Sequence, residues 1–263
     1  MPSIGPLMLA SLSPLAYALL VPTAAIAGFV DSIAGGGGIL TLPALLAAGL
    51  PPRFALGTNK LQSSFGSLSA TLRFKRAGLL RLKGLWPALA FTAVGAAAGA
   101  AAASALSSSF LSYLIPALLV AIVVFLALQP RFGARAGVRR LSPLAFSACS
   151  GLALGFYDGF FGPGTGTFWA MAFVGLAGLD LREATASTKA TNFASNIVSL
   201  AVFVASGSVL FPLGLAMGIA QALGAHAGSG LVLKRGAGLV RALLMGMSAL
   251  IVVYIVLKYW VLA

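Results

Sequence analysis

Ionisable residues recur at matched positions inside two otherwise apolar stretches of this chain. Each aspartate stands in a Gly-Phe-x-Asp motif followed by a glycine-rich break, and two extra residues in the second copy bring the lysines into register. A charge within apolar sequence must lie against protein or water, because an isolated buried ion is strongly destabilising. The fold must therefore keep charged side chains away from lipid at two places, one in each stretch. The repeated positions are Asp31 and Lys60 in the first stretch, Gly28–Phe74, and Asp158 and Lys189 in the second, which begins at Gly155.

The composition excludes a soluble domain. Of 263 residues, 60% are hydrophobic and 8% are charged, whereas soluble domains carry about 25% charged residues. The apolar runs are long and continuous, unlike the short alternating strands of a membrane β-barrel. One cysteine, Cys149, and one histidine exclude an internal disulfide and a multi-cysteine metal site. The net charge of +13 is interpreted as cytoplasmic loops that follow the positive-inside rule, not as a nucleic-acid surface.

Ten apolar segments divide equally between two halves. The sequence therefore predicts an all-α polytopic membrane protein, with two inverted-topology repeats of about five transmembrane or re-entrant segments each. The repeats are residues 1–130 and 141–263, which together form one membrane domain. The predicted segments of the first half are Pro14–Ile33, Ile39–Gly49, Phe54–Arg73, Leu85–Leu106 and Phe110–Leu128. Those of the second half are Pro143–Phe161, Thr165–Leu179, Ala184–Ala205, Val209–Leu233 and Ala237–Leu262.

Loop charges predict the orientation. An odd number of crossings per half gives the halves opposite orientations and places both termini on the periplasmic side. The first thirty residues contain no Lys or Arg, so they lack the charged start of a signal peptide. The second segment of each half is shorter than the ~20 residues that a straight crossing needs, so it is either re-entrant or part of a broken helix. The basic clusters Arg73–Lys83, Arg131–Arg140 and Lys234–Arg241 are expected in the cytoplasm and Ser107–Ser109 outside.

Glycine breaks offer a way to bind an anion. Gly35–Gly38 precede one short segment and Gly162–Gly164 precede the other. A helix that restarts after a break presents free N–H groups and a partial positive charge. If the fold brings the two restarts together, an anion can lie between them. The alternative is that the glycines only allow close packing of helices.

The lysines share helix faces with other polar residues. Lys60 lies on one face with Ser63 and Ser67, and Lys189 lies on the matching face with Asn192 and Asn196. Two lysines and two aspartates facing lipid would cost roughly 10–14 kcal/mol, comparable to the stability of a whole protein. They must face protein or a wet cavity. One interpretation is that the lysines bind an anion. The others are that they pair with the aspartates as internal struts, or lie near a membrane surface.

Two roles are open for Asp31 and Asp158. Burial raises the pKa of a carboxyl group, so each aspartate can be protonated and take part in proton coupling. Alternatively, each pairs with a lysine or caps a restarting helix through its free N–H groups. The second interpretation is favoured, because a carboxylate beside a glycine-rich helix start is well placed to accept from those donors.

The string GFVDSIAGGGG, followed by ILTLPALLAAGLPP and ALGTNKLQSSFGS, resembles the TauE/SafE family of membrane permeases, the sulfite exporter and 4-toluene sulfonate uptake permeases. The resemblance spans nearly the whole chain, including both halves and the Gly57–Lys60 signature. The second half departs from this signature with Ala186-Ser187-Thr188-Lys189. The resemblance implies transport of small anions, such as sulfite or sulfoacetate, across the bacterial inner membrane.

The sequence thus predicts a secondary transporter that exports small anions. The alternatives are an intramembrane enzyme and a structural membrane protein with buried Asp–Lys pairs. The absence of G-x-x-x-x-G-K-[ST] means that gradients supply the energy, and no H-E-x-x-H or G-x-S-x-G motif indicates an enzyme. No catalytic residue, metal or cofactor is expected, and the partners are the anion and the lipid bilayer. The predicted substrate-binding residues are Asn59, Lys60, Ser63, Lys189, Asn192, Asn196, Gly36, Gly37, Gly38, Gly164 and Thr165, with Asp31 and Asp158 as structural or coupling residues.

Overall fold

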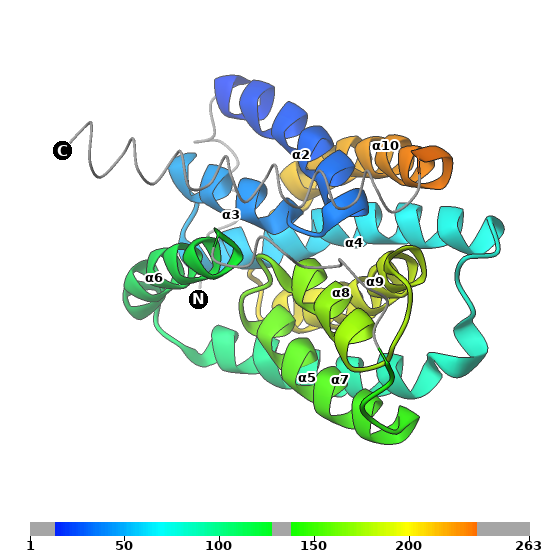
Figure 1. The fold of residues 1–263 in the computed structure, drawn as a ribbon. Coiled ribbons are helices and arrows are strands. Elements are labelled where there is room, and N and C mark those ends of the chain that lie inside the picture. The colour runs from blue at the N-terminus through cyan, green and yellow to red at the C-terminus, as the bar shows by residue number, and fades with distance from the viewer. Residues whose placement is uncertain (1–13, 128–137, 236–263) are drawn as a thin grey trace.

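The computed structural model describes residues 14–127 and 138–235, and the regular structure in these ranges is helical (Figure 1). The predicted all-α fold is confirmed for this part of the chain. The last predicted segment, Ala237–Leu262, lies outside the described residues. The helices of the first half are α2 (Pro14–Ala34), α3 (Gly37–Ala47), α4 (Pro52–Arg76), the short 3-10 helix η1 (Leu82–Gly84), α5 (Trp86–Ala105) and α6 (Ser108–Ala127). Those of the second half are α7 (Pro143–Phe160), α8 (Thr165–Gly175), α9 (Leu181–Ala205) and α10 (Phe211–Arg235).

Local sequence sets where the polar helices begin. Helix α4 begins at Pro52, earlier than the predicted Phe54, because a proline suits the first turn of a helix. Helix α9 begins at Leu181, earlier than the predicted Ala184, because the Asp180 carboxylate accepts hydrogen bonds from the next backbone N–H groups. Four described helices, α2, α5, α6 and α10, are long and apolar enough to cross a membrane. The more polar α4 and α9 carry the lysines.

The two short helices fold back against their predecessors. The end of α3 lies beside the start of α2, where Ala44 and Ala47 share a cavity wall with Leu15 and Leu19. The end of α8 lies beside the start of α7, because the backbone N–H groups of Arg140 and Leu141 donate to Leu176 O at 2.9 and 3.3 Å. Each pair is therefore a helical hairpin with a glycine break at its tip.

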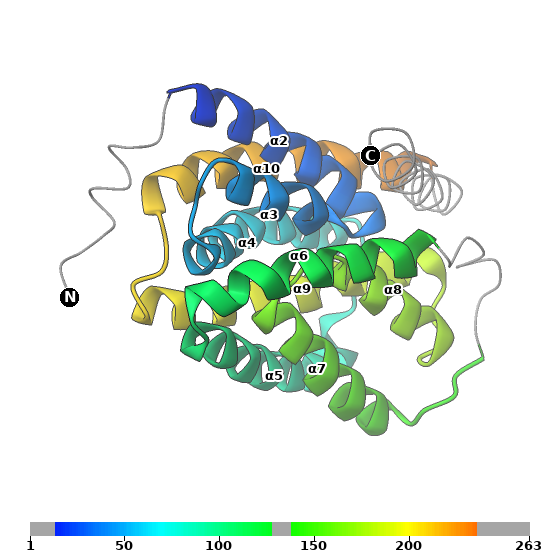
Figure 2. The ribbon, with the colours of Figure 1, turned by 90° about the vertical axis from the view of Figure 1, so that its left-hand side faces the viewer.

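Each half covers the first helix of the other. Figures 1 and 2 show α10 beside α2 along one edge of the molecule and α5 beside α7 along the opposite edge, with α4 and α9 between them. Gly224 of α10 packs on the backbone of α2 at Ala25, and Gly159 of α7 packs on the backbone of α5 at Ala96. Glycines allow such close helix contacts, as is common in membrane proteins. The two halves are therefore interleaved by tight, glycine-mediated contacts.

Candidate functional site

The tips of the two hairpins meet inside the molecule. A Cβ atom added to Gly166 would lie 2.7 Å from Gly35 Cα, and one added to Gly38 would lie 3.2 Å from Pro163 Cα. The Thr167 hydroxyl donates across the contact to Gly35 O at 2.5 Å. The fold therefore brings the two helix restarts together, and glycine is required there for close packing as well. The glycine breaks can therefore serve both close helix packing and the binding of an anion at the helix restarts.

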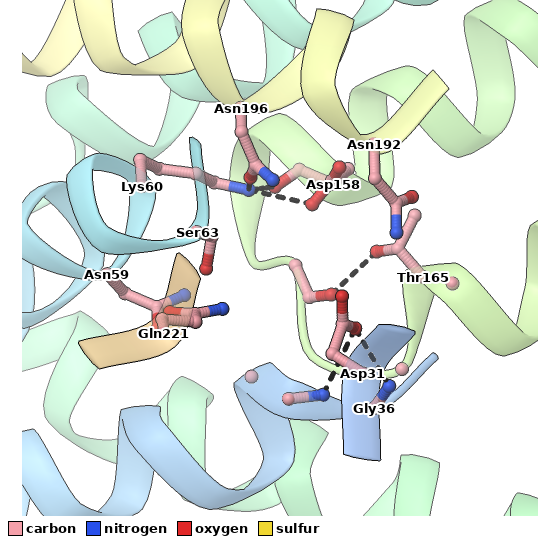
Figure 3. A pocket seen from close by; sticks show the side chains of 15 residues that line it. Asp31, Gly36, Asn59, Lys60, Ser63, Asp158, Thr165, Asn192, Asn196 and Gln221 are labelled. Carbon is pink, nitrogen blue, oxygen red and sulfur yellow. Dashed lines mark hydrogen bonds and ion pairs between the residues drawn. The ribbon is translucent and has the colours of Figure 1, made fainter. Parts of the chain in front are cut away.

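A polar cavity of about 30 Å³ lies beside the tips (Figure 3). Since one water needs roughly 10–15 Å³ on the same measure, the cavity has room for a small ion or a few waters. Every predicted substrate-binding residue except Lys189 lines it. The lining residues are Asp31, Gly36, Gly37, Gly38, Asn59, Lys60, Ser63, Asp158, Gly162, Gly164, Thr165, Gly166, Asn192, Asn196 and Gln221.

Lys60 of α4 reaches across the cavity to the end of α7 (Figure 3). Its Nζ lies 2.7 Å from Asp158 Oδ1 and 2.5 Å from the Asp158 carbonyl oxygen. It also donates to Asn196 Oδ1 at 3.4 Å, while the second Asp158 carboxylate oxygen accepts a hydrogen bond from Ser195. The side chains of Lys60 and Asp158 are 0% and 4% exposed. This is a fully buried ion pair between the two halves.

Lys189 of α9 makes the reciprocal pair with the first half. Its Nζ lies 3.0 Å from Asp31 Oδ2 and also donates to the Asp31 carbonyl oxygen. The other carboxylate oxygen, Asp31 Oδ1, accepts from the backbone N–H groups of Gly36 and Gly37 at 3.1 and 3.2 Å. Asp31 thus both holds a lysine and caps a helix restart. Lys189 stands behind Asp31 and not on the cavity wall.

The reciprocal pairs differ in one respect. Among the contacts of the described residues, Asp158 accepts from Lys60 and Ser195, and not from the backbone of the Gly162–Gly164 break. The expected capping of a restart by an aspartate is therefore found at Asp31 and not at Asp158. The Asp31 side chain is also more accessible, at 18% exposed.

Unpaired groups face the cavity. No described residue accepts from the backbone N–H of Gly38 or Gly166, which belong to the first turns of α3 and α8. The Asn59 carbonyl oxygen accepts from Thr41 and Gln62, which leaves its NH₂ group as a donor. Two acceptors, Asn192 Oδ1 and Gln221 Oε1, are buried without a partner among the described residues. The cavity can therefore bind a small polar ion through donors from both halves.

Some cavity residues escaped the sequence interpretation. Gln221 lines the cavity from α10, and its polar side chain in an apolar segment was the available signal. Ser195 does not line the cavity but donates to Asp158, which does, and it directly precedes the predicted Asn196. Within the described ranges, no group of three or more His, Cys, Asp and Glu side chains could hold a metal ion.

Apolar spanning helices around a polar cavity, formed where two broken hairpins meet, define the architecture of a membrane transporter. The comparison with known families agrees. The profile of the sulfite exporter TauE/SafE family matches residues 20–255. The chain belongs to this family and is a multi-pass membrane transporter.

The chain is similar to curated relatives over most of its length. It is 44% identical over 231 residues to the probable membrane transporter protein ORF9 of Sinorhizobium sp, covering 88% of each chain. It is 43% identical over 237 residues to the probable membrane transporter protein YfcA of Escherichia coli K12, covering 90% of this chain and 88% of the relative. A probable membrane transporter protein of Haemophilus influenzae is 39% identical over 231 residues, with 88% and 91% covered. No solved structure matches the chain.

Proposed function

We propose that this transporter carries small anions, such as sulfite or related organosulfur anions, through the cavity between the hairpin tips. The observation that carries the proposal is the convergence of the Lys60 ammonium group and two helix N-termini, those of α3 and α8, on one small polar cavity. Helix N-termini favour anions because their N–H groups are unpaired and the helix dipole is positive there. The family description, sulfite exporter, supports the same substrate class.

The anion accepts hydrogen bonds from the free N–H groups of Gly38 and Gly166 and from the Asn59 amide. It also competes with Asp158 for Lys60, whose ammonium group borders the cavity. When no anion is bound, the carboxylate of Asp158 keeps the lysine paired. Lys189 acts indirectly, because it holds Asp31, which in turn caps α3.

Reversible binding follows from this charge balance. The charges of the two lysines and the two aspartates cancel, so the site has no net charge. An incoming anion therefore meets no ammonium group that lacks a carboxylate partner. A unit charge 4 Å from another is worth about 4 kcal/mol at an effective dielectric constant of 20. Displacement of Asp158 from Lys60 leaves its carboxylate buried without this partner. This cost offsets the attraction between Lys60 and the incoming anion, so the anion can be released again, as a carrier requires.

The same pairs also brace the structure. Removal of one partner from a buried ion pair typically costs about 3–5 kcal/mol, because the other charge remains buried. The strut interpretation and the binding interpretation of the lysines thus apply together. We assign Lys60 to both the structural and the anion-binding role, and Lys189 mainly to the structural role.

The proposed setting is the bacterial inner membrane, with two inverted repeats, 1–130 and 141–263, and both termini in the periplasm. The two hairpins support this arrangement: α3 ends near the start of α2, and α8 ends near the basic residues Arg139 and Arg140. By the positive-inside rule the second of these ends is cytoplasmic. Transport in the export direction is proposed from the family description.

Flux measurements in proteoliposomes test the proposed substrate class. The purified protein is reconstituted and the efflux of sulfite, sulfoacetate, sulfate, phosphate and chloride is compared with that from protein-free liposomes. We expect at least one of the sulfur anions to move faster than phosphate, which carries hydroxyl donors at neutral pH, and chloride, which is monatomic. Movement of none of these sulfur anions, with neutral or cationic solutes carried instead, would contradict the proposal.

A further inference from the structure

A second and larger cavity, of about 310 Å³, opens at the basic end of the molecule. It lies between the starts of α5, α7 and α9 and the end of α8. Its polar lining includes Arg81, Arg139, Glu183 and Ser187, and its floor is apolar. Figure 1 shows that the ends of α4 and α10, which carry Arg76 and Arg235, lie toward the same end of the molecule.

The charges of this cavity favour anions. Two arginines and one glutamate line it, which gives an excess of one positive charge. Both arginines are exposed, so they can attract a solute from the water before it enters. A cavity lined with an excess of one charge sign concentrates ions of the opposite sign and speeds their arrival. The cavity is thus suited to collect the kind of ion that the central cavity binds.

One helix joins the two cavities. Helix α8 begins at the central cavity with Thr165 and reaches the basic-end cavity with Phe173. Trp169 lies midway on the same helix face, since residues one turn apart share a face. Its ring is stacked on Phe173, with centroids 5.2 Å apart, and lies edge-on to Phe146 of α7 at 6.3 Å. All three rings are buried and form an aromatic barrier along α8: Phe146 and Phe173 line the basic-end cavity, and Trp169 lies one turn from Thr165 of the central cavity.

Two buried polar atoms, one on α8 and one on α9, have no partner among the described residues. Trp169 Nε1 is buried and donates to no described residue. Thr188 Oγ1 is also buried and unpaired, one turn along α9 from Asn192 of the central cavity and next to Ser187 of the outer one. An unsatisfied buried polar group destabilises a protein. The unpaired atoms of Trp169 on α8 and Thr188 on α9 are explained if they face water or the ion when the aromatic barrier opens.

We propose that the cavity at the basic end is an outer binding site for the transported anion, and that Trp169, Phe173 and Phe146 form a closed gate between it and the central cavity. The proposal rests on the proposed function for the identity of the ion. The anion is captured near Arg81 and Arg139, and it passes Trp169 Nε1 and Thr188 Oγ1 when the rings separate.

Cysteine accessibility tests the gate. Thr188→Cys and Ser187→Cys are made separately in a Cys149→Ser background. Membrane vesicles of both orientations are then treated with the anionic thiol reagent 2-sulfonatoethyl methanethiosulfonate. We expect Ser187→Cys to react from one face only and Thr188→Cys to react slowly from either. Adding Trp169→Ala should raise the Thr188→Cys rate by more than an order of magnitude, and only from the face that reaches Ser187→Cys.

Phe168→Ala is the matched control, because Phe168 is the neighbouring aromatic on α8 but packs against Phe125 and Tyr157, away from the barrier. It should leave the Thr188→Cys rate unchanged. Phe146→Ala removes a ring of the same cluster from α7. If Trp169→Ala fails to insert into the membrane, Phe146→Ala should raise the Thr188→Cys rate in its place. Fast reaction of Thr188→Cys with all rings intact, or no acceleration in either ring variant, would overturn the gate.

The charge of the outer site has its own test. Arg81→Gln with Arg139→Gln should slow the anionic reagent at Ser187→Cys by about tenfold at low salt, as expected for loss of electrostatic attraction, and should spare a cationic reagent of similar size. Lys83→Gln, an exposed neighbour outside the cavity lining, is the control. Equal slowing of both reagents, or none, would overturn the outer anion site. Because labelling needs no transported substrate, its failure is distinct from a failure of the flux experiment.

Discussion

Lys60 and Asp158 show how charges are kept inside a membrane protein. Each would be costly in lipid, yet the two lie 2.7 Å apart, and Asn196 Oδ1 accepts a further hydrogen bond from Lys60 while Ser195 donates one to Asp158. A buried pair contributes little net stability, because desolvation opposes the Coulomb attraction. This is why we propose an ion-binding role, besides a structural one, for the pair that lines the cavity.

The two aspartates should respond differently to loss of charge. We expect Asp158→Asn to reduce the free energy of unfolding by about 3–5 kcal/mol, because it leaves the fully buried Lys60 without its ion-pair partner. Asp31→Asn should cost only about 1–3 kcal/mol, because the amide oxygen still accepts from Gly36 and Gly37 and the side chain at this position is more exposed. Denaturant unfolding of the purified proteins in detergent measures both changes.

Transport by Asp31→Asn separates the two roles that a carboxylate can play there. If Asp31 is a permanently ionised cap and lysine partner, the variant keeps most of its transport and the pH dependence of that transport. Asp31→Ala, which removes the cap as well, should lose more stability than Asp31→Asn by about 1–2 kcal/mol. Disappearance of the pH dependence in a folded Asp31→Asn protein would instead identify a titrating, coupling carboxylate.

Single residues were predictable where the sequence repeats itself. Asp31, Asp158, Lys60 and Lys189 stand out because charges are rare in apolar sequence. Which lysine meets which aspartate was not predictable, because the pairs cross between halves and depend on how the helices pack. The same holds for Gln221, which reaches the cavity only because α10 packs against α2 and α4.

At the scale of elements, the hairpins were only half predictable. The glycine breaks and the short segments are visible in sequence, but hydrophobicity does not show whether a short helix continues across the membrane or turns back. The turn-back depends on tertiary contacts, such as the hydrogen bonds of Arg140 and Leu141 to Leu176. The meeting of the tips depends on Gly35 and Gly166, whose contact partner lies in the other half.

Substitution at a tip should disturb the site while the rest of the fold is kept. In Gly166→Ala the new Cβ would lie 2.7 Å from Gly35 Cα and 3.1 Å from Asn192 Nδ2, so the tips must separate. We expect transport to fall strongly and stability to drop by about 1–3 kcal/mol, the usual range for overpacking. Flux and unfolding are measured on the same preparations.

Gly175→Ala is the matched control, at the other end of the same helix. A Cβ there meets nothing within 4 Å, and alanine favours a helix over glycine by about 1 kcal/mol. It should leave transport intact and stability unchanged or slightly higher. Equal effects of the two substitutions would show that the tip contact has no special role.

At the scale of the molecule, the two halves depend on each other. Helix α10 covers α2, α5 covers α7, and both ion pairs cross between the halves. Neither half buries its own charges, so neither is expected to fold alone.

The predicted orientation is tested by labelling intact cells with a membrane-impermeant maleimide. In a Cys149→Ser background, Ser108→Cys lies between α5 and α6 and should react, whereas Lys83→Cys in the basic segment should react only after the membrane is opened. Both positions are exposed, so reactivity reports the side and not burial. The reverse pattern would place the basic end outside and contradict the positive-inside assignment.

The most direct test of the anion site is sulfite efflux from proteoliposomes that contain either the unchanged protein or Lys60→Gln combined with Asp158→Asn. The double variant replaces the buried pair by two amides that can bond to each other, so it should fold with near-normal stability. It lacks the ammonium group that the anion needs, so we expect it to carry sulfite at least about tenfold more slowly, the factor for a loss of about 1.4 kcal/mol. Sulfite efflux at the unchanged rate in a folded double variant would show that Lys60 does not bind the transported anion.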